Sequence, residues 1–193
     1  AVLIGITVFF FVAKTKASDV VEVRQVTEQD RTKIEKTYDF RDFQNISVIG
    51  GWQLSLTQAD TYSISITMPQ YLEEMVTIEK KGDTLVLAVR PETQFNMGPN
   101  PVTAELTLPQ LHGFQTRGGS QAEISDFTSD TLRIQSDGAT SIHGDDNVIT
   151  SLSLQTTGAA DINFKDCSVT NADVLMQGAG SLKVTMEGGR LTG

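Results

Sequence analysis

A repeat of twenty residues in the C-terminal part of the chain restricts the possible folds more than any other feature of the sequence. Three segments align without gaps, namely TLRIQSDGATSIHGDD from Thr131, SLSLQTTGAADINFKD from Ser151 and NADVLMQGAGSLKVTM from Asn171. Each has a glycine at the same position, followed by alanine, and a looser fourth copy precedes them. The four repeat glycines are Gly118, Gly138, Gly158 and Gly178. Self-similarity at a fixed period of this length is typical of solenoid proteins.

One copy of the repeat predicts a strand, a tight corner and a second strand. Glycine at the corner permits backbone angles that a Cβ atom would forbid, and the small residue after it lets successive corners approach. A single copy is too thin to bury its apolar face, so stability has to come from stacking on neighbouring copies. We therefore expect an all-β protein whose C-terminal half is a single-stranded parallel β-helix, a β-solenoid with about 20 residues per coil. An antiparallel sandwich with evenly spaced hairpins is the alternative, but it does not require side chains to match position by position.

From Tyr38 onward, the chain alternates apolar and polar residues with a period of two, which indicates strands with one buried face. Turn residues separate these runs, as at Lys81–Asp83. The alternating apolar pairs are Ile46 and Val48, Leu54 and Leu56, Ile64 and Ile66, Val76 and Ile78, Leu85 and Leu87, and Leu106 and Leu108. We expect residues 38–193 to form one β-helix domain. A new strand would start at Leu191, so we expect this domain to be incomplete at Gly193.

The N-terminus begins with an uninterrupted apolar run, AVLIGITVFFFVA, followed by two lysines. This run is shorter than the roughly 20 residues of a transmembrane helix and resembles the apolar region of a signal peptide. The chain starts at Ala1 and not at methionine, so residues 1–17 are either a signal peptide or a truncated membrane anchor. A buried element of the domain is the further alternative. Residues 18–37 are polar and predict a spacer, with one short strand at Val20–Val26.

Charge and cysteine content exclude several functions. The formal net charge of −9 disfavours a nucleic-acid partner, since nucleic-acid binding draws its affinity from clustered Lys and Arg. Cys167 is the single cysteine, so an intramolecular disulfide and a cysteine-based metal site are both ruled out. We interpret it as a small, partly buried residue beside a turn.

Residues twenty apart in such a repeat stack about 4.8 Å apart, which allows a search for functional pairs. Asp146 and Asp166 are the pair that could bind Ca²⁺ or divide the roles of acid and base. Their sequence neighbours also resemble solvated turns, and that interpretation is favoured. Two surface ion pairs follow from the same spacing, Arg117 with Asp137 and Asp145 with Lys165.

Two other residues have opposing interpretations. His143 falls in one polar column with Asn163 and Lys183, which favours a solvent-facing position over a catalytic one. Trp52 is the single tryptophan. It is either an exposed platform for a glycan or, as we favour, a cover over the open end of the solenoid.

The segments GGSQAEI, SDGATSI, TTGAADI and QGAGSL, with FQNISVIGGWQLSLTQAD, GDTLVLAV and AELTLPQLHGF before them, resemble the putative auto-transporter adhesin family with the head GIN domain. The resemblance runs from Asp39 to Gly193, although the corners here are not the Gly-Ser-Gly of most members. It implies a single right-handed β-helix in a bacterial envelope protein, and it brings no catalytic residues.

We therefore expect a non-catalytic exported protein of the bacterial cell envelope, in the periplasm or on the cell surface, that presents a flat β surface as an adhesin or binding module. A glycan or a protein of the envelope is the expected partner, and the N-terminus is expected at the membrane. The sequence assigns no cofactor, no metal and no catalytic residue. A polysaccharide-processing enzyme on a β-helix scaffold is the alternative, and a structural spacer tethered to a membrane partner is a third possibility.

Overall fold

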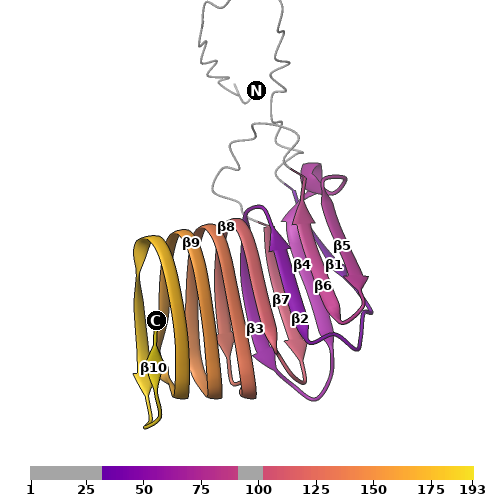
Figure 1. The fold of residues 1–193 in the computed structure, drawn as a ribbon. Helices are drawn as coiled ribbons and strands as arrows, with labels where there is room; N and C mark the ends of the chain where they lie inside the picture. The colour runs from indigo at the N-terminus through magenta and orange to yellow at the C-terminus, as the bar shows by residue number, and fades with distance from the viewer. Residues whose placement is uncertain (1–31, 91–101) are drawn as a thin grey trace, which may run out of the picture.

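A computed structural model describes residues 32–90 and 102–193 of the chain (Figure 1). One short 3₁₀-helix, η2 (Gln70–Leu72), lies between the fourth and fifth strands. The strands are β1 (Lys33–Thr37), β2 (Asn45–Ile49), β3 (Trp52–Gln58), β4 (Ser63–Pro69), β5 (Val76–Lys81), β6 (Thr84–Val89), β7 (Val102–Leu108), β8 (Gly113–Ser125), β9 (Thr128–Met186) and β10 (Leu191–Thr192).

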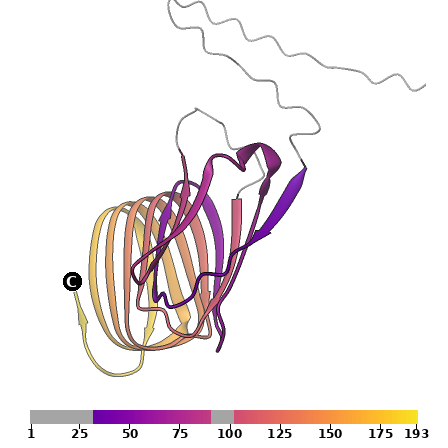
Figure 2. The same cartoon turned by 90° about the vertical axis from the view of Figure 1, so that its right-hand side faces the viewer.

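The strands form one ten-stranded sheet with parallel and antiparallel neighbours. Most of it follows the order β1-β4-β7-β3-β8-β2-β6-β5, and β9 joins through β8 and β10 through β9. The first part of β8 pairs with β2 and the second part with β3, so the long strand β8 connects the two branches of the sheet. Figure 2 shows the sheet curled around an interior.

The expectation of a single parallel β-helix over residues 38–193 is wrong, because the sheet is mixed. β4 runs antiparallel to both β1 and β7, and β5 runs antiparallel to β6. The short connection from β5 to β6 at Lys81–Asp83 reverses the chain direction, with Gly82 at φ +62°. Alternation with a period of two places one face inward in parallel and antiparallel strands alike, so it did not distinguish the two arrangements.

The twenty-residue spacing of the repeat is present as a pairing register within this curled, mixed sheet. β8 pairs in parallel with the first part of β9, with Gly118 opposite Gly138 and Ile124 opposite Gly144. β9 then bends back repeatedly, and its successive segments lie side by side in Figures 1 and 2. The repeat therefore determines which residues are neighbours across β8 and β9.

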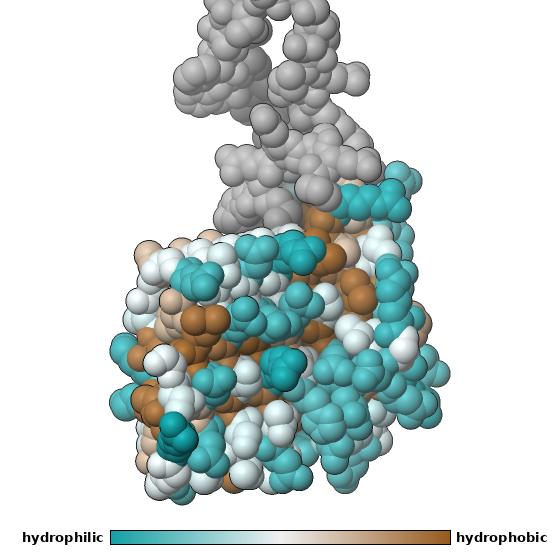
Figure 3. Space-filling view, viewed as in Figure 1, coloured by the Kyte–Doolittle hydropathy of each residue, from teal (hydrophilic) through white to brown (hydrophobic). Residues whose placement is uncertain are grey.

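The hydrophobic core fills the interior of the curled sheet. In β3 and β7, buried and more exposed residues alternate, as the period of two predicted. Four phenylalanines with an exposed fraction of at most 1% anchor the core, namely Phe43, Phe114, Phe127 and Phe164. On the face in Figure 3, hydrophilic side chains gather on the right-hand side, over β5 and β6, and hydrophobic ones show between polar ones over β8 and β9.

The sheet begins earlier than the sequence predicted. β1 lies within residues 18–37, the segment interpreted as a spacer, and pairs with β4 from Lys33 opposite Pro69 to Thr37 opposite Ser65. The predicted signal peptide or anchor at residues 1–17 and the predicted strand at Val20–Val26 lie outside the described residues. Within the described ranges, the structure contains no helix of the length and apolarity needed to span a membrane.

Candidate functional site

The repeat glycines form a row of closely approaching backbones. Gly118, Gly138, Gly158 and Gly178 all have positive φ, at +114°, +124°, +109° and +129°. A Cβ atom placed on Gly158 would lie 2.6 Å from the carbonyl oxygen of Gly138. Any larger residue would therefore meet both an unfavourable backbone angle and the preceding segment. This row sets the spacing of the residues that follow each glycine.

An open groove of about 860 Å³ runs beside this row of glycines. Its lining comes from β3, β8 and successive segments of β9. The residue after each glycine is exposed and small, which leaves the surface hollow. These four residues are Gly119, Ala139, Ala159 and Ala179. The next exposed positions along the groove hold polar side chains, namely Gln121, Ser141, Asp161 and Ser181.

A second hollow of about 370 Å³ lies next to the groove and is more polar. It shares Gln53, Gln121 and Ser141 with the groove, so the two hollows are continuous. Its lining also includes His143 and Glu123, which face each other across the register of β8 and β9. Together the hollows form one continuous concave surface over β3, β7, β8 and β9.

Trp52 borders the groove but is not an exposed platform. Its side chain is 2% exposed, and its Nε1 donates a hydrogen bond to the carbonyl oxygen of Ile49 at 3.1 Å. In the sheet it lies between Val102 of β7 and Ser120 of β8. Both interpretations of the sequence therefore fail for Trp52, since it neither offers an open face to a glycan nor closes the end of the stack.

One member of the carboxylate pair predicted from the sequence, Asp166, lies in a cluster of three potential metal ligands. Asp166 lies with His143 and Asp145, and one potential ligand atom from each of the three lies within 4.8 Å of the others. Asp146 is not part of this group and occupies a turn-like position with φ +51°. His143 and Asp145 are two residues apart on one strand, so both point to the same face. In the sequence, this spacing of two residues could have indicated that His143 and Asp145 lie together.

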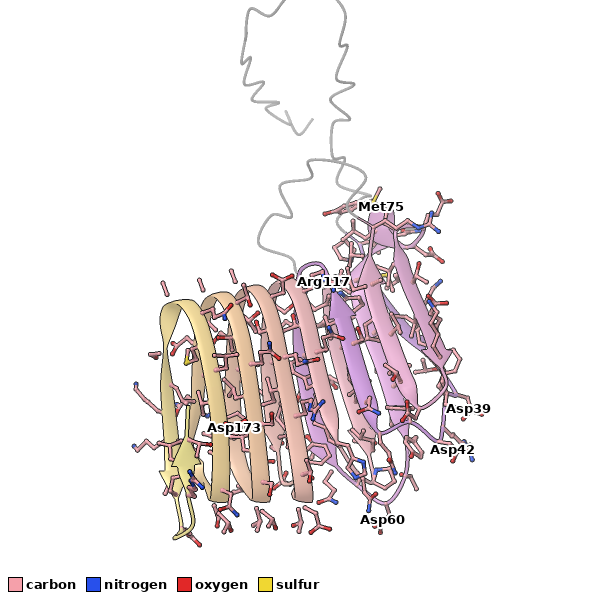
Figure 4. All side chains as sticks on the ribbon, viewed as in Figure 1. Asp39, Asp42, Asp60, Met75, Arg117 and Asp173 are labelled. Carbon is pink, nitrogen blue, oxygen red and sulfur yellow. The ribbon has the colours of Figure 1, made fainter. Side chains whose placement is uncertain are left out.

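Of the two ion pairs predicted from the stacking, one is present. The Arg117 Nε atom lies 3.8 Å from Asp137 Oδ2, with both side chains exposed, and Arg117 lies at the upper edge of the ribbon in Figure 4. An exposed pair at this distance contributes little to stability. Among the described residues, Asp145 and Lys165 form no ion pair, and the Asp145 carboxylate lies instead beside His143 and Asp166.

Cys167 is buried near this cluster and lies within β9, whereas the sequence predicted a partly buried position beside a turn. Asn147 donates a hydrogen bond to its sulfur atom at 3.4 Å. Burial raises the pKa of the Cys167 thiol, and the nearby carboxylates of Asp145 and Asp166 raise it further, while the bond from Asn147 opposes them. The folded chain therefore holds this proton more tightly than the unfolded chain. Ionisation of Cys167 should therefore not affect the free energy of unfolding at neutral pH. The free energy of unfolding should decrease as the pH rises above the ordinary thiol pKa of 9.0, because the unfolded chain loses this proton first.

We expect the native protein to resist thiol reagents. At pH 8, the reaction of Cys167 with dithionitrobenzoate should be roughly 100-fold slower in the folded protein than in urea, because the thiol must first be exposed by opening. The release of thionitrobenzoate at 412 nm measures both rates. Equal rates in the two conditions would show that the thiol is accessible in the folded state.

The structure defines a class of all-β proteins with a curled sheet and a groove of small residues along its repeats. The family model described as "Putative auto-transporter adhesin, head GIN domain" matches residues 42–187. The chain belongs to this family, which is named for adhesins, a class of envelope or surface proteins. No curated protein matches the sequence.

Solved structures share the fold at low sequence identity. A putative adhesin from Bacteroides fragilis NCTC 9343 is 17% identical with a TM-score of 0.63, and 81% of each chain is covered. A putative adhesin from Parabacteroides merdae ATCC 43184 is 13% identical with a TM-score of 0.54, covering 83% of this chain and 95% of that one. A putative lipid binding protein from Parabacteroides distasonis ATCC 8503 is 13% identical with a TM-score of 0.53, covering 83% and 96%. At these identities the likeness shows the fold alone.

Proposed function

We propose that this protein is an exported, non-catalytic binding protein of the bacterial cell envelope, and that its groove holds a neutral polysaccharide. The open groove of about 860 Å³ along the repeats carries the proposal. Membership of an adhesin family supports a location in the envelope or at the surface, and the apolar segment in residues 1–17 supports export. The groove volume is within the range of roughly 300–1,000 Å³ typical of ligand sites.

The groove is suited to an extended ligand without charge. Small exposed residues let a ligand approach the backbone closely, and the serine and glutamine side chains offer donors and acceptors for sugar hydroxyls. Asp161 is the one charged residue among the described residues of the lining. Its carboxylate accepts a hydrogen bond from Ser181 Oγ at 2.5 Å, which partly satisfies its charge.

The charge of the chain favours a neutral over an anionic polymer. The net charge is −9, so an anionic polysaccharide would be repelled. A protein of the envelope is the other class of partner, and the experiment below distinguishes it.

A binding role is supported over an enzymatic one by the composition of the groove. Most glycosidases place two carboxyl groups across the scissile bond, at separations of about 5–10 Å. The groove itself contains the single carboxylate of Asp161, and the carboxylates of Glu105 and Glu123 belong to the second hollow. An enzyme on this scaffold would release new reducing ends from the polysaccharide that it binds, and we expect none.

Filling the groove is expected to weaken binding. The labelled full chain should bind neutral glycans on an array, and Ala159→Arg should weaken that binding at least about tenfold, equivalent to about 1.4 kcal/mol. Ala159 is exposed in the groove, so the larger side chain can point to solvent and block the ligand without disturbing the core.

Gln155→Arg is the matched control, because Gln155 is exposed on the same repeat but does not line the groove. It should bind as the unchanged protein does. Equal loss in both variants would point to the added charge and not to the groove. If no glycan binds, and a pull-down from envelope extracts instead recovers a protein that Ala159→Arg releases, the polysaccharide proposal is wrong and the partner is a protein.

A further inference from the structure

The side chains of His143, Asp145 and Asp166 converge on one point of the molecular surface. The imidazole and the two carboxylates place one nitrogen or oxygen each within 4.8 Å of the other two. Asp145 and Asp166 are exposed. The three come from two segments of β9, since Asp166 lies beyond the next repeat glycine, Gly158. Tertiary structure thus joins groups that are 23 residues apart in the chain, from His143 to Asp166.

The polar atoms of these three side chains have no hydrogen-bond or ion-pair partner within the part of the chain that the structure describes. Lys165 lies twenty residues after Asp145, the spacing that places residues opposite each other in the register, yet the Asp145 carboxylate lies with a second carboxylate instead. Two carboxylates this close repel each other unless a cation lies between them.

We propose that His143, Asp145 and Asp166 bind a divalent transition-metal cation, with Zn²⁺ as the ion of best fit. One imidazole nitrogen and two carboxylate oxygens are ligands that Zn²⁺ accepts, whereas Ca²⁺ and Mg²⁺ prefer oxygen ligands alone. Bonds of about 2.0–2.2 Å in a tetrahedral site place ligand atoms about 3.3–3.6 Å apart. The present separations, up to 4.8 Å, would have to shorten to that value when the cation binds.

The cluster leaves one tetrahedral position for a further ligand. Three protein ligands and one exchangeable position are the arrangement of an open zinc site, where water or an external donor completes the coordination. His143 also lines the polar hollow that continues from the groove. A metal at this point would offer a fixed positive charge to a ligand on a protein whose net charge is −9. The inference does not depend on the polysaccharide proposal.

Calorimetric titration of the full chain with ZnCl₂ at neutral pH tests the proposal. We expect saturable binding with one ion per chain, and His143→Gln and Asp166→Asn should each weaken it at least about tenfold. CaCl₂ should bind more weakly than ZnCl₂. In addition, Zn²⁺ should shift the imidazole resonances of His143 in nuclear magnetic resonance spectra and leave those of His112 in place.

Two matched controls separate this cluster from general effects of charge. The chain has two histidines, so His112→Gln removes the other one, and it should leave Zn²⁺ binding unchanged. Asp146→Asn removes a carboxylate adjacent to Asp145 in sequence but outside the cluster, and it should also have no effect. The proposal is overturned if Zn²⁺ shows no saturable binding, if His143→Gln binds as before, or if either control loses affinity as His143→Gln does.

Discussion

Gly138→Ala is expected to lower the free energy of unfolding by about 4 kcal/mol, which is a large part of the roughly 5–15 kcal/mol that holds a domain folded. Two effects add at this position. Gly138 has φ +124°, an angle that residues with a Cβ rarely adopt, and the new Cβ would lie 2.4 Å from the carbonyl oxygen of Gly118. That oxygen belongs to the backbone of a paired strand, so it cannot move aside without breaking the pairing.

Urea unfolding followed by tryptophan fluorescence measures this effect, since Trp52 is buried and is the only tryptophan. Gly82→Ala is the matched control. Gly82 has φ +62°, and its added Cβ would meet nothing within 4 Å, so the expected cost is about 1 kcal/mol from the backbone angle alone. A similar loss in both variants would contradict the close approach of the repeat corners.

Asn147→Ala is expected to be the second most damaging change, at about 3 kcal/mol. Asn147 is 1% exposed and connects neighbouring segments. Its Oδ1 accepts a hydrogen bond from the backbone N–H of Phe127 at 2.9 Å, and its Nδ2 donates to the carbonyl oxygen of Ile124 at 2.6 Å. Alanine would leave the buried N–H of Phe127 without this acceptor and the carbonyl of Ile124 without this donor.

Asn163→Ala provides the comparison for Asn147→Ala. The Asn163 Oδ1 atom accepts a hydrogen bond from the Lys165 N–H at 3.2 Å at the protein surface, where water can replace it. We expect the loss to stay below about 1 kcal/mol in the same urea titration. An equally small loss for Asn147→Ala would contradict this prediction. It would mean that water enters the space left by the side chain and bonds to the N–H of Phe127 and the carbonyl of Ile124.

Much of the strand structure was predictable from local alternation. The pairs Leu54 and Leu56 or Leu106 and Leu108 are buried in strands, as the period of two required. The direction of those strands was not predictable, because alternation looks the same in parallel and antiparallel neighbours. The prediction of a parallel β-helix was therefore wrong: the strands form one curled, mixed sheet in which β1, β4 and β5 run antiparallel to their neighbours.

The candidate site was predictable only in part. The register of twenty residues correctly placed Arg117 beside Asp137. It also suggested Asp146 with Asp166, and it did not indicate the cluster in which Asp166 lies. Asp166 lies with His143 and Asp145. Burial of Trp52 was likewise hidden from the sequence, because a tryptophan after two glycines suits an exposed turn as well as the beginning of a buried strand.

The sequence by itself determined the all-β class, the twenty-residue pairing between β8 and β9 and the small residues beside the repeat glycines, because periodicity and side-chain size are local properties. Tertiary structure alone decided the mixed direction of the sheet, the groove and the cluster of His143 with two carboxylates. Each of these depends on how distant segments curl and which way a side chain turns at a corner. Those choices are set by packing across the whole sheet, which no local pattern records.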